Sequence, residues 1–197
     1  MIPLIIIGVV VFILAAFLIS LYNRLVALRA RFRNAFSQIE VQLTRRYDLI
    51  PNLVETAKGY LKHESETLTK ITEARSGAIQ SLKEAAANPG APESILNLNQ
   101  AEKALNSSLH GLRIQIEAYP DLKASTNMIQ LSEELASTEN RIAFARQAYN
   151  DEATLYNIQR NSFPANMFAG MFGHGEDAAL LAFENAEEIQ KAPRVQF

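Results

Sequence analysis

The first positions of the chain form a predominantly apolar run, from Ile2 to Leu21, without a charged residue. A helix needs about 20 apolar residues to cross the roughly 30 Å hydrocarbon core of a bilayer, so this run is long enough to span it. A cleaved signal peptide is the alternative, but no basic residue precedes the run and no small-x-small site precedes the polar sequence. The pattern therefore predicts a retained transmembrane helix over residues 1–21.

Beyond this run, apolar residues recur every three or four positions, the spacing of one face of an amphipathic helix. The members of this first stripe are Leu21, Leu25, Leu28, Phe32, Phe36, Ile39 and Leu43. We expect the helix that carries them to be continuous with the membrane span.

A possible chain reversal follows at the sequence RRYDLIP. Arg45 and Arg46 would suit a helix C-terminus, where positive charge is favoured, and Asp48 could be the N-cap of a new helix. Pro51 would then fall in the first turn, where its missing N–H costs nothing. We predict that the chain reverses at these residues. The alternative is a proline kink in one longer helix.

Three more stripes follow, from Ile50 to Leu82, from Ile95 to Ile116 and from Met128 to Tyr156. Turn residues end the second stripe, and Tyr119-Pro120 ends the third because a residue before proline avoids helical geometry. The heptad-like spacing indicates near-parallel packing of the coiled-coil kind. The sequence therefore predicts an all-α fold, with an antiparallel bundle of about four long helices over residues 22–162.

The expected helix lengths do not match one another. A second helix of about 39 residues rises roughly 58 Å, whereas the soluble part of the first, about 25 residues, rises roughly 37 Å. An antiparallel pair would carry Lys83 and Glu84 to bilayer depth, which is costly for charged groups. We therefore expect a bend in the first helix near the membrane, a tilted bundle, or an interruption of the second helix near Gly77.

Residues 163–197 differ from the stripes. The stretch FPANMFAGMFG carries no charge and places five large apolar residues on one face, namely Phe163, Met167, Phe168, Met171 and Phe172. This face could cap the bundle, lie at the membrane surface or contact another subunit. It is a candidate contact with a partner or with another copy of the chain. An acidic stretch and an extended tail follow it.

Composition and charge narrow the function. A chain of 197 residues has room for one anchor and one domain, and a net charge of −2 gives no general attraction to nucleic acid. No cysteine is present, which excludes disulfides, thiolate metal sites and cysteine nucleophiles.

Basic residues predict the orientation in the membrane. Arg24, Arg29, Arg31 and Arg33 follow the apolar run, and no lysine or arginine precedes it. The positive-inside rule then places the N-terminus outside and the bundle in the cytoplasm. These arginines could also bind anionic lipid headgroups. The alternative is a bundle on the outer side of the membrane.

Several charged residues fall on the apolar stripes. Glu64 and Arg75 lie on the second, Glu102 lies on the third, and Glu139 and Arg146 are two turns apart on the fourth helix. Buried charge is costly unless it is paired, so Glu64, Arg75, Glu139 and Arg146 are candidates for a polar network inside the bundle. The alternative is that they lie at helix edges and reach water.

Catalytic chemistry has little support in the sequence. His63 and Glu64 suggest a metal or acid/base site, but the HExxH spacing is absent because position 67 is Thr67. We therefore assign no catalytic, cofactor-binding or metal-ligating residue. A hydrolase or metal-dependent enzyme with a site around His63, Glu64 and Glu139 is the alternative.

Blocks along most of the chain resemble a known family. The longest runs from Tyr22 to Glu64, and ARSGA, EAYPDLKAS, ELASTENRIAFARQAYND, LYNIQRNSFPAN and RVQF follow it in order. They are similar to the LemA family of bacterial membrane proteins, although Phe36 stands where that pattern usually carries tryptophan. The resemblance implies an anchored helical bundle in the cytoplasmic membrane, without a set of catalytic residues. Members are often encoded near membrane zinc proteases, which suggests a membrane protease among the protein partners.

These observations favour a non-enzymatic scaffold or adaptor, held in the membrane by one span. It would present a bundle face or the apolar C-terminal segment to membrane partners or to another copy of itself. A stalk that transmits signals across the bilayer is a further alternative.

Overall fold

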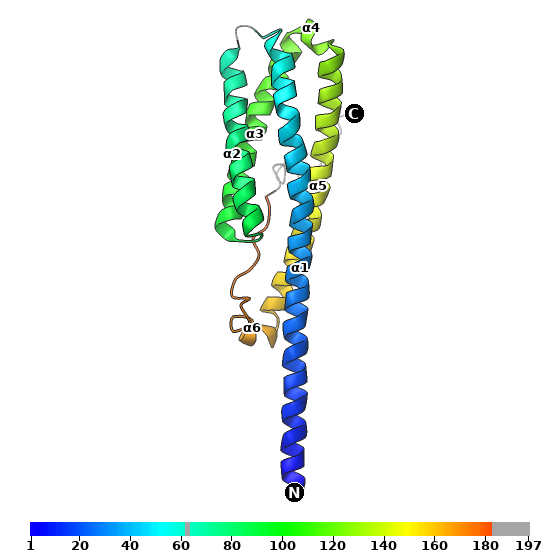
Figure 1. The fold of residues 1–197 in the computed structure, drawn as a ribbon, viewed down its shortest axis with the longest axis vertical. Helices are drawn as coiled ribbons and strands as arrows, with labels where there is room; N and C mark the ends of the chain where they lie inside the picture. Colours follow the sequence, from blue (N-terminus) through cyan, green and yellow to red (C-terminus); the bar gives the residue numbers. More distant parts are fainter. Residues whose placement is uncertain (62–63, 183–197) are drawn as a thin grey trace, which may run out of the picture.

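The computed structural model describes residues 1–61 and 64–182, and within these ranges every regular element is a helix (Figure 1). The elements are α1 (Ile2–Lys58), α2 (Ser65–Ala87), α3 (Pro92–Ala118), α4 (Pro120–Lys123), α5 (Thr126–Asn161) and α6 (Ala165–Phe168). The predicted all-α fold with an N-terminal transmembrane helix is thus confirmed. The domain boundaries after residues 21 and 162 stay predictions.

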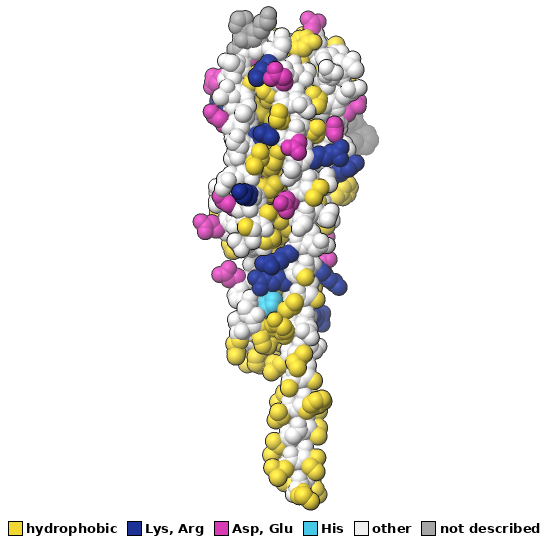
Figure 2. Space-filling model, viewed as in Figure 1, with side chains coloured by type: hydrophobic (Ala, Val, Ile, Leu, Met, Phe, Trp, Pro, Cys, Tyr) yellow, Lys and Arg dark blue, Asp and Glu magenta, His cyan; other side chains and the backbone are white. Residues whose placement is uncertain are grey.

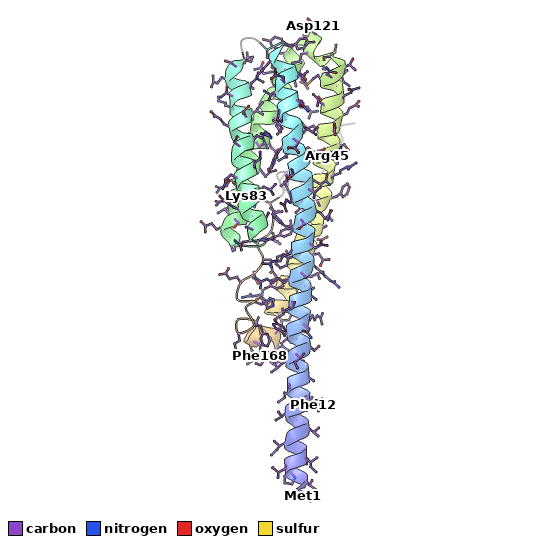
Figure 3. All side chains as sticks on the ribbon, viewed as in Figure 1. Met1, Phe12, Arg45, Lys83, Asp121 and Phe168 are labelled. Carbon is purple, nitrogen blue, oxygen red and sulfur yellow. The ribbon has the colours of Figure 1, made fainter. Side chains whose placement is uncertain are left out.

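The 57-residue helix α1 belongs to both the membrane anchor and the bundle. Its first residues project beyond every other element, and Phe12 lies on this bare part (Figure 3). An 18-residue window of α1 reaches a mean hydropathy of 3.2 while only 6% of it is buried, as expected for a segment that faces lipid. Figure 2 shows this end as a rod covered by apolar side chains.

Beyond Leu21, α1 becomes the middle helix of the bundle. It packs against α5 and α2, while α2 and α3 pair as an antiparallel hairpin. The single turn of α4 links α3 to α5 at the end far from the N-terminus, near Asp121 (Figure 3). Besides Arg46, the largest fully buried side chains are Tyr47, Tyr149, Phe36, Leu25, Ile39, Leu43, Ile50, Leu61, Ile71, Ile95 and Leu98.

The predicted reversal at Arg45, Arg46, Asp48 and Pro51 is wrong. Helix α1 continues through Pro51 to Lys58, and Arg46 is buried inside the bundle. The reason is that the buried stripe keeps its phase across the proline, with members Leu43, Tyr47, Ile50, Val54 and Ala57. The chain instead reverses between Lys58 and Ser65, and His63 lies outside the described residues.

This later reversal also removes the expected mismatch of helix lengths. The part of α1 beyond Leu21 rises about 55 Å, against about 35 Å for the 23 residues of α2, so α2 ends well short of the membrane. Helix α2 runs through Gly77 without an interruption, so this one of the three expected alternatives is wrong. The turn after α2 packs closely against Phe32 of α1. A Cβ on Gly90 in this turn would lie 3.0 Å from the Phe32 ring, so the position favours glycine.

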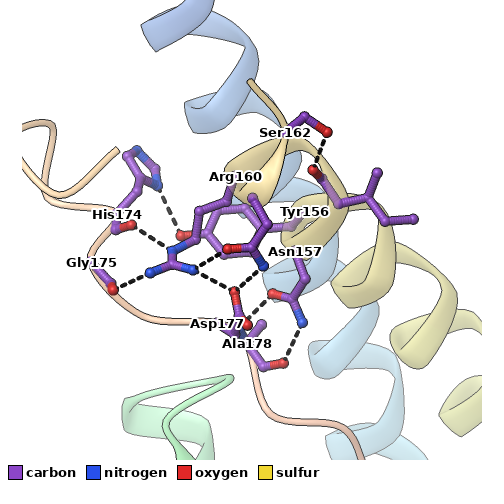
Figure 4. Close-up of polar contacts among 10 residues, drawn as sticks. Tyr156, Asn157, Arg160, Ser162, His174, Gly175, Asp177 and Ala178 are labelled. Atoms are coloured by element: carbon purple, nitrogen blue, oxygen red, sulfur yellow. Dashed lines mark hydrogen bonds and ion pairs between the residues drawn. The ribbon is translucent and has the colours of Figure 1, made fainter. Parts of the chain in front are cut away.

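After α6 the chain returns along α5 as an extended segment, residues 173–182, which we call the strap. Two asparagines of α5 hold its backbone. Asn157 donates to the Ala178 carbonyl at 2.9 Å and accepts from the Ala178 N–H at 2.7 Å, as Figure 4 shows. Asn150 makes the same pair of bonds with Leu181, both at 2.9 Å. Two clamps, two turns of α5 apart, therefore fix the strap in register.

Polar contacts close the membrane-proximal end of the strap. The Arg160 guanidinium donates to the His174 carbonyl at 2.8 Å and to Asp177 at 2.7 Å, and it also contacts the Gly175 carbonyl (Figure 4). A hydrogen bond of 3.1 Å joins the Tyr156 hydroxyl to His174 Nδ1. Burial and, to a lesser degree, the Arg29 guanidinium lower the pKa of His174, which favours a neutral imidazole.

Candidate functional site

The most polar part of the bundle interior surrounds Arg46 of α1. The guanidinium donates to Asn106 Oδ1 of α3 at 3.0 Å and to Glu139 Oε1 of α5 at 2.9 Å. It also pairs with the buried Glu102 carboxylate of α3, which accepts a further hydrogen bond from the Tyr47 hydroxyl. One buried cation therefore joins three helices. We call Arg46, Tyr47, Glu102, Asn106 and Glu139 the polar centre.

The charges of the polar centre stabilise one another. Burial alone would lower the pKa of Arg46, but the carboxylates of Glu102 and Glu139 outweigh this effect and raise the pKa above its usual value. Burial and the nearby Glu102 raise the pKa of Tyr47, so its hydroxyl keeps its proton. With one guanidinium between two carboxylates, the polar centre has an excess of negative charge. Part of this negative charge is accessible from the surface, because the Glu139 side chain is 39% exposed.

The structure assembles the predicted polar network from partly different residues. Glu139 takes part, and so does Glu102, which the sequence placed on the third stripe. Arg146 instead donates to the Ala182 carbonyl of the strap at 2.9 Å. Glu64 is the N-cap of α2, roughly 16 Å along that helix from Arg75. The alternative enzyme site around His63, Glu64 and Glu139 stays a prediction, because His63 lies outside the described residues.

Sequence reasoning missed Arg46 as the central cation because it assigned this residue to a helix end. The signal that could have found it is the phase of the first stripe. Arg46 and Tyr47 follow Leu43 by three and four positions, which places both on the buried side of a helix that does not stop.

Arg75 has a separate role, which Pro51 creates. Proline has no backbone N–H, so the carbonyl four residues earlier, that of Tyr47, loses its partner within the helix. Arg75 of α2 supplies the missing donor, with its Nε 2.6 Å from the Tyr47 oxygen. The proline is thus compatible with a continuous α1 because a neighbouring helix satisfies the carbonyl that it frees.

We expect the energies of Arg75 and Pro51 to be coupled. Arg75→Met should lower the free energy of unfolding by about 1–3 kcal/mol, because it leaves the Tyr47 carbonyl without a donor. In a Pro51→Ala background the N–H of residue 51 can bond this carbonyl, so the coupling energy should be about 1–2 kcal/mol. A urea-denaturation double-mutant cycle measures it. The control is Lys83→Met, at an exposed position of α2, whose effect on the free energy of unfolding should add to that of Pro51→Ala without coupling. If the effects of Arg75→Met and Pro51→Ala are also additive, Arg75 does not compensate for the proline.

An open groove lies beside the polar centre, between α3 and α5. Its volume is about 490 Å³, and its floor includes Leu53 of α1. The α3 wall consists of Asn106, Leu109, His110, Leu112, Arg113 and Ile116, and the α5 wall consists of Ser132, Leu135, Ala136 and Glu139. Asn106 and Glu139 also bind Arg46, so the groove opens directly onto the polar centre.

The arginines that follow the membrane span lie at the opposite, membrane-proximal end of the bundle. Arg29 donates to the Gly173 carbonyl of the strap at 3.2 Å. Arg29 and Arg33 line a second cavity of about 390 Å³, between α1, the α2–α3 turn and the strap. Arg24 and Arg31 are exposed. Their roles in orientation and headgroup binding stay predictions.

The five residues of the apolar C-terminal segment do not share one face. Phe172 packs edge-on against Tyr22 of α1, with ring centroids 5.5 Å apart, and Phe168 stacks on Phe172. Phe163, Met167 and Met171 point away and are exposed. The segment therefore caps the base of the bundle with one side and leaves the other side free. The part of the tail after residue 182 lies outside the described residues.

Comparisons with known proteins agree with this architecture. The model of the LemA family matches residues 35–197. Protein LemA of Metamycoplasma hominis is 30% identical over 169 residues, which cover 86% of this chain and 71% of that protein. Magnetosome protein MamQ 2 of Paramagnetospirillum magneticum is 28% identical over 203 residues, covering 95% and 71% of the two chains. Magnetosome protein MamQ of Magnetospirillum gryphiswaldense is 27% identical over 178 residues, covering 81% and 65%.

These matches cover most of the chain, and the exposed apolar end of α1 adds the feature expected of a membrane-associated protein. The family model covers more than half of the chain, and a named member is similar across most of its own length. The chain therefore belongs to the LemA family.

Proposed function

We propose that this protein is a non-enzymatic scaffold, anchored in the membrane by α1, which holds a helix of a partner protein in the groove between α3 and α5. The observation that carries the proposal is the groove itself. Contacts between α5 and α1, α1 and α2, and α2 and α3 close three sides of the bundle. On the fourth side the strap joins α5 to Asn99 of α3 toward the membrane, and beyond it the described residues leave the groove between α3 and α5 open. A bundle with one open side is suited to receive a further helix.

The lining of the groove defines the chemistry of that helix. Leu109, Leu112 and Ile116 of α3 recur at helical spacing and face Leu135 of α5 across the groove. Amphipathic helices bind to such surfaces through apolar residues spaced by three or four positions. At one end the groove presents Glu139, with the excess negative charge of the polar centre behind it. We therefore expect an apolar face on the partner helix, with a lysine or arginine opposite Glu139.

The continuity of α1 explains how a scaffold of this kind would work. The membrane span and the middle helix of the bundle are one helix, so no flexible linker separates the groove from the bilayer. A partner bound in the groove would be held at a fixed height. We place the bundle in the cytoplasm because the four arginines follow the span, and we expect the partner to be associated with the same membrane.

Site-specific photo-crosslinking in intact cells tests the proposal. A photoreactive residue at Leu109 should give a discrete adduct, and the same residue at the exposed Ile79 of α2 should not. Leu135→Glu places a charge in the groove without touching Arg46, so it should abolish the adduct while the helical circular dichroism signal is retained. Mass spectrometry should then locate the crosslink on the apolar face of an amphipathic helix of a second protein.

Three results would contradict the proposal. Equal crosslinking from Leu109 and Ile79 would show that the groove does not select a partner. An adduct that survives Leu135→Glu would show that the apolar lining is not the binding surface. An adduct with twice the mass of the chain would identify a second copy as the occupant.

A further inference from the structure

The short apolar segment at the base of the bundle, residues 163–172, lies where α1 leaves the membrane. We call it the apolar knuckle. Phe172 rests on Tyr22, the residue that directly follows the uncharged run of α1, and Leu21 is itself only 7% exposed. Figures 1 and 3 show α6 and Phe168 beside α1, at the point below which α1 continues alone. The knuckle is therefore at the level of the membrane boundary.

The side of the knuckle that faces away from the bundle is apolar. Phe163 is 81% exposed, Met167 is 64% exposed and Met171 is 84% exposed. No charged residue interrupts the chain from Ser162 to Gly173. Removing such side chains from water is favourable, so three of them exposed at one place form an apolar surface that is suited to a contact. Figure 2 shows an apolar group at the base of the bundle, next to the apolar rod formed by the bare part of α1.

Positive charge lies directly beyond this surface. Arg24, Arg29, Arg31 and Arg33 follow Tyr22 on α1, and Figure 2 shows basic side chains above the apolar group. Arg29 also binds the Gly173 carbonyl, which ties the arginines to the end of the knuckle. Apolar residues with cationic residues on their aqueous side are the arrangement of elements that lie in a membrane interface.

The knuckle is held rigidly in this position. Ala165 and Ala169 are buried against the bundle, and the Ala169 carbonyl accepts hydrogen bonds from the N–H groups of His174 and Phe172, at 2.9 and 3.2 Å. Phe172 also packs on Tyr22 of α1, while Phe163, Met167 and Met171 are exposed. The exposed side chains therefore stay at the membrane boundary.

We propose that the apolar knuckle is a second membrane contact, in which Phe163, Met167 and Met171 insert into the lipid interface beside α1. Lipid is the occupant because this surface is continuous with the lipid-facing part of α1 and ends at a band of arginines. Two contacts, one through the bilayer and one in its interface, restrain rotation and tilt of the bundle about α1.

Single tryptophan residues can test this proposal, because the chain contains no tryptophan. The full chain with Phe163→Trp or Met171→Trp is reconstituted in phosphatidylcholine–phosphatidylglycerol vesicles, with and without bromine on the acyl chains. Emission should fall about twofold or more in brominated vesicles, because an interfacial side chain lies roughly 5–10 Å into the headgroup and acyl boundary. Phe12→Trp in the span gives the reference for full contact with lipid.

Phe144→Trp is the matched control, because Phe144 is 74% exposed on α5 and lies far along the bundle from the knuckle. Its emission should not change with bromination. The proposal is overturned if Phe163→Trp and Met171→Trp behave like Phe144→Trp. It is also overturned if their emission shifts to the blue with rising protein-to-lipid ratio but is not quenched by bromine, since that result identifies a second copy of the chain as the contact.

Discussion

Replacing Arg46 by methionine is expected to lower the free energy of unfolding by about 3–5 kcal/mol, the largest effect of any single substitution proposed for this protein. The guanidinium is fully buried and pairs with Glu102 and Glu139. Methionine retains much of the volume but leaves the buried Glu102 carboxylate without its cation. Urea unfolding of the detergent-solubilised chain, followed by circular dichroism, measures the loss.

The neighbouring arginine provides a matched control. Arg45 pairs with Glu134 on the surface, with both side chains almost half exposed, so Arg45→Met should cost only about 0–1 kcal/mol. Adding Glu102→Gln to Arg46→Met removes the uncompensated charge and should restore part of the lost stability. Equal losses from Arg45→Met and Arg46→Met would show that the polar centre does not contribute more than a surface ion pair.

The double substitution Asn150→Asp with Asn157→Asp is expected to release the strap from α5. Each aspartate keeps the shape of the side chain but replaces an N–H donor by an oxygen that faces a strap carbonyl, at Leu181 or Ala178. The lost bond and the unpaired carbonyl should cost about 1–3 kcal/mol at each clamp. The residue before Ala178 in the strap is Asp177, so a carboxylate at position 157 also adds a like charge close to this part of the strap.

Thiol labelling gives a local measurement of strap release, since the chain has no native cysteine. Ala178 is 5% exposed, so Ala178→Cys should react slowly with a maleimide in the parent and many times faster in the double variant. Glu176→Cys, at an exposed position, should react quickly in both. Asn97→Asp, on the exposed face of α3, controls for the added charge. Unchanged protection of residue 178 in the double variant would show that the two clamps do not hold the strap.

Pro51 illustrates how local rules and tertiary packing can disagree. Arg45 and Arg46 near a C-terminus and Asp48 as an N-cap would each contribute about 1 kcal/mol, and these small terms supported the predicted turn. The buried stripe of α1 outweighs them, because Ile50, Val54 and Ala57 continue the phase set by Leu43. The proline leaves the Tyr47 carbonyl without its hydrogen bond within α1. Arg75 of α2 donates to this carbonyl and so reduces the energetic cost.

The sequence by itself determined three features: the transmembrane helix, the all-α class and the family. Each depends on a pattern that can be read along one segment: an uncharged run of sufficient length, apolar residues at helical spacing, and blocks of matching residues. Short-range physics is enough for these features, so they do not require knowledge of which helices meet.

Only the tertiary structure decided which residues make the sites. Arg46 and Glu139 are 93 positions apart, and their contact depends on how α1 and α5 are rotated about their axes. One position along a helix turns a side chain by about 100°, so a small phase error moves a charged residue from the interior to the surface. The same reason separates Phe172, which packs on Tyr22, from Phe163 and Met171, which face outward. The polar centre, the groove and the apolar knuckle therefore follow from packing between distant segments.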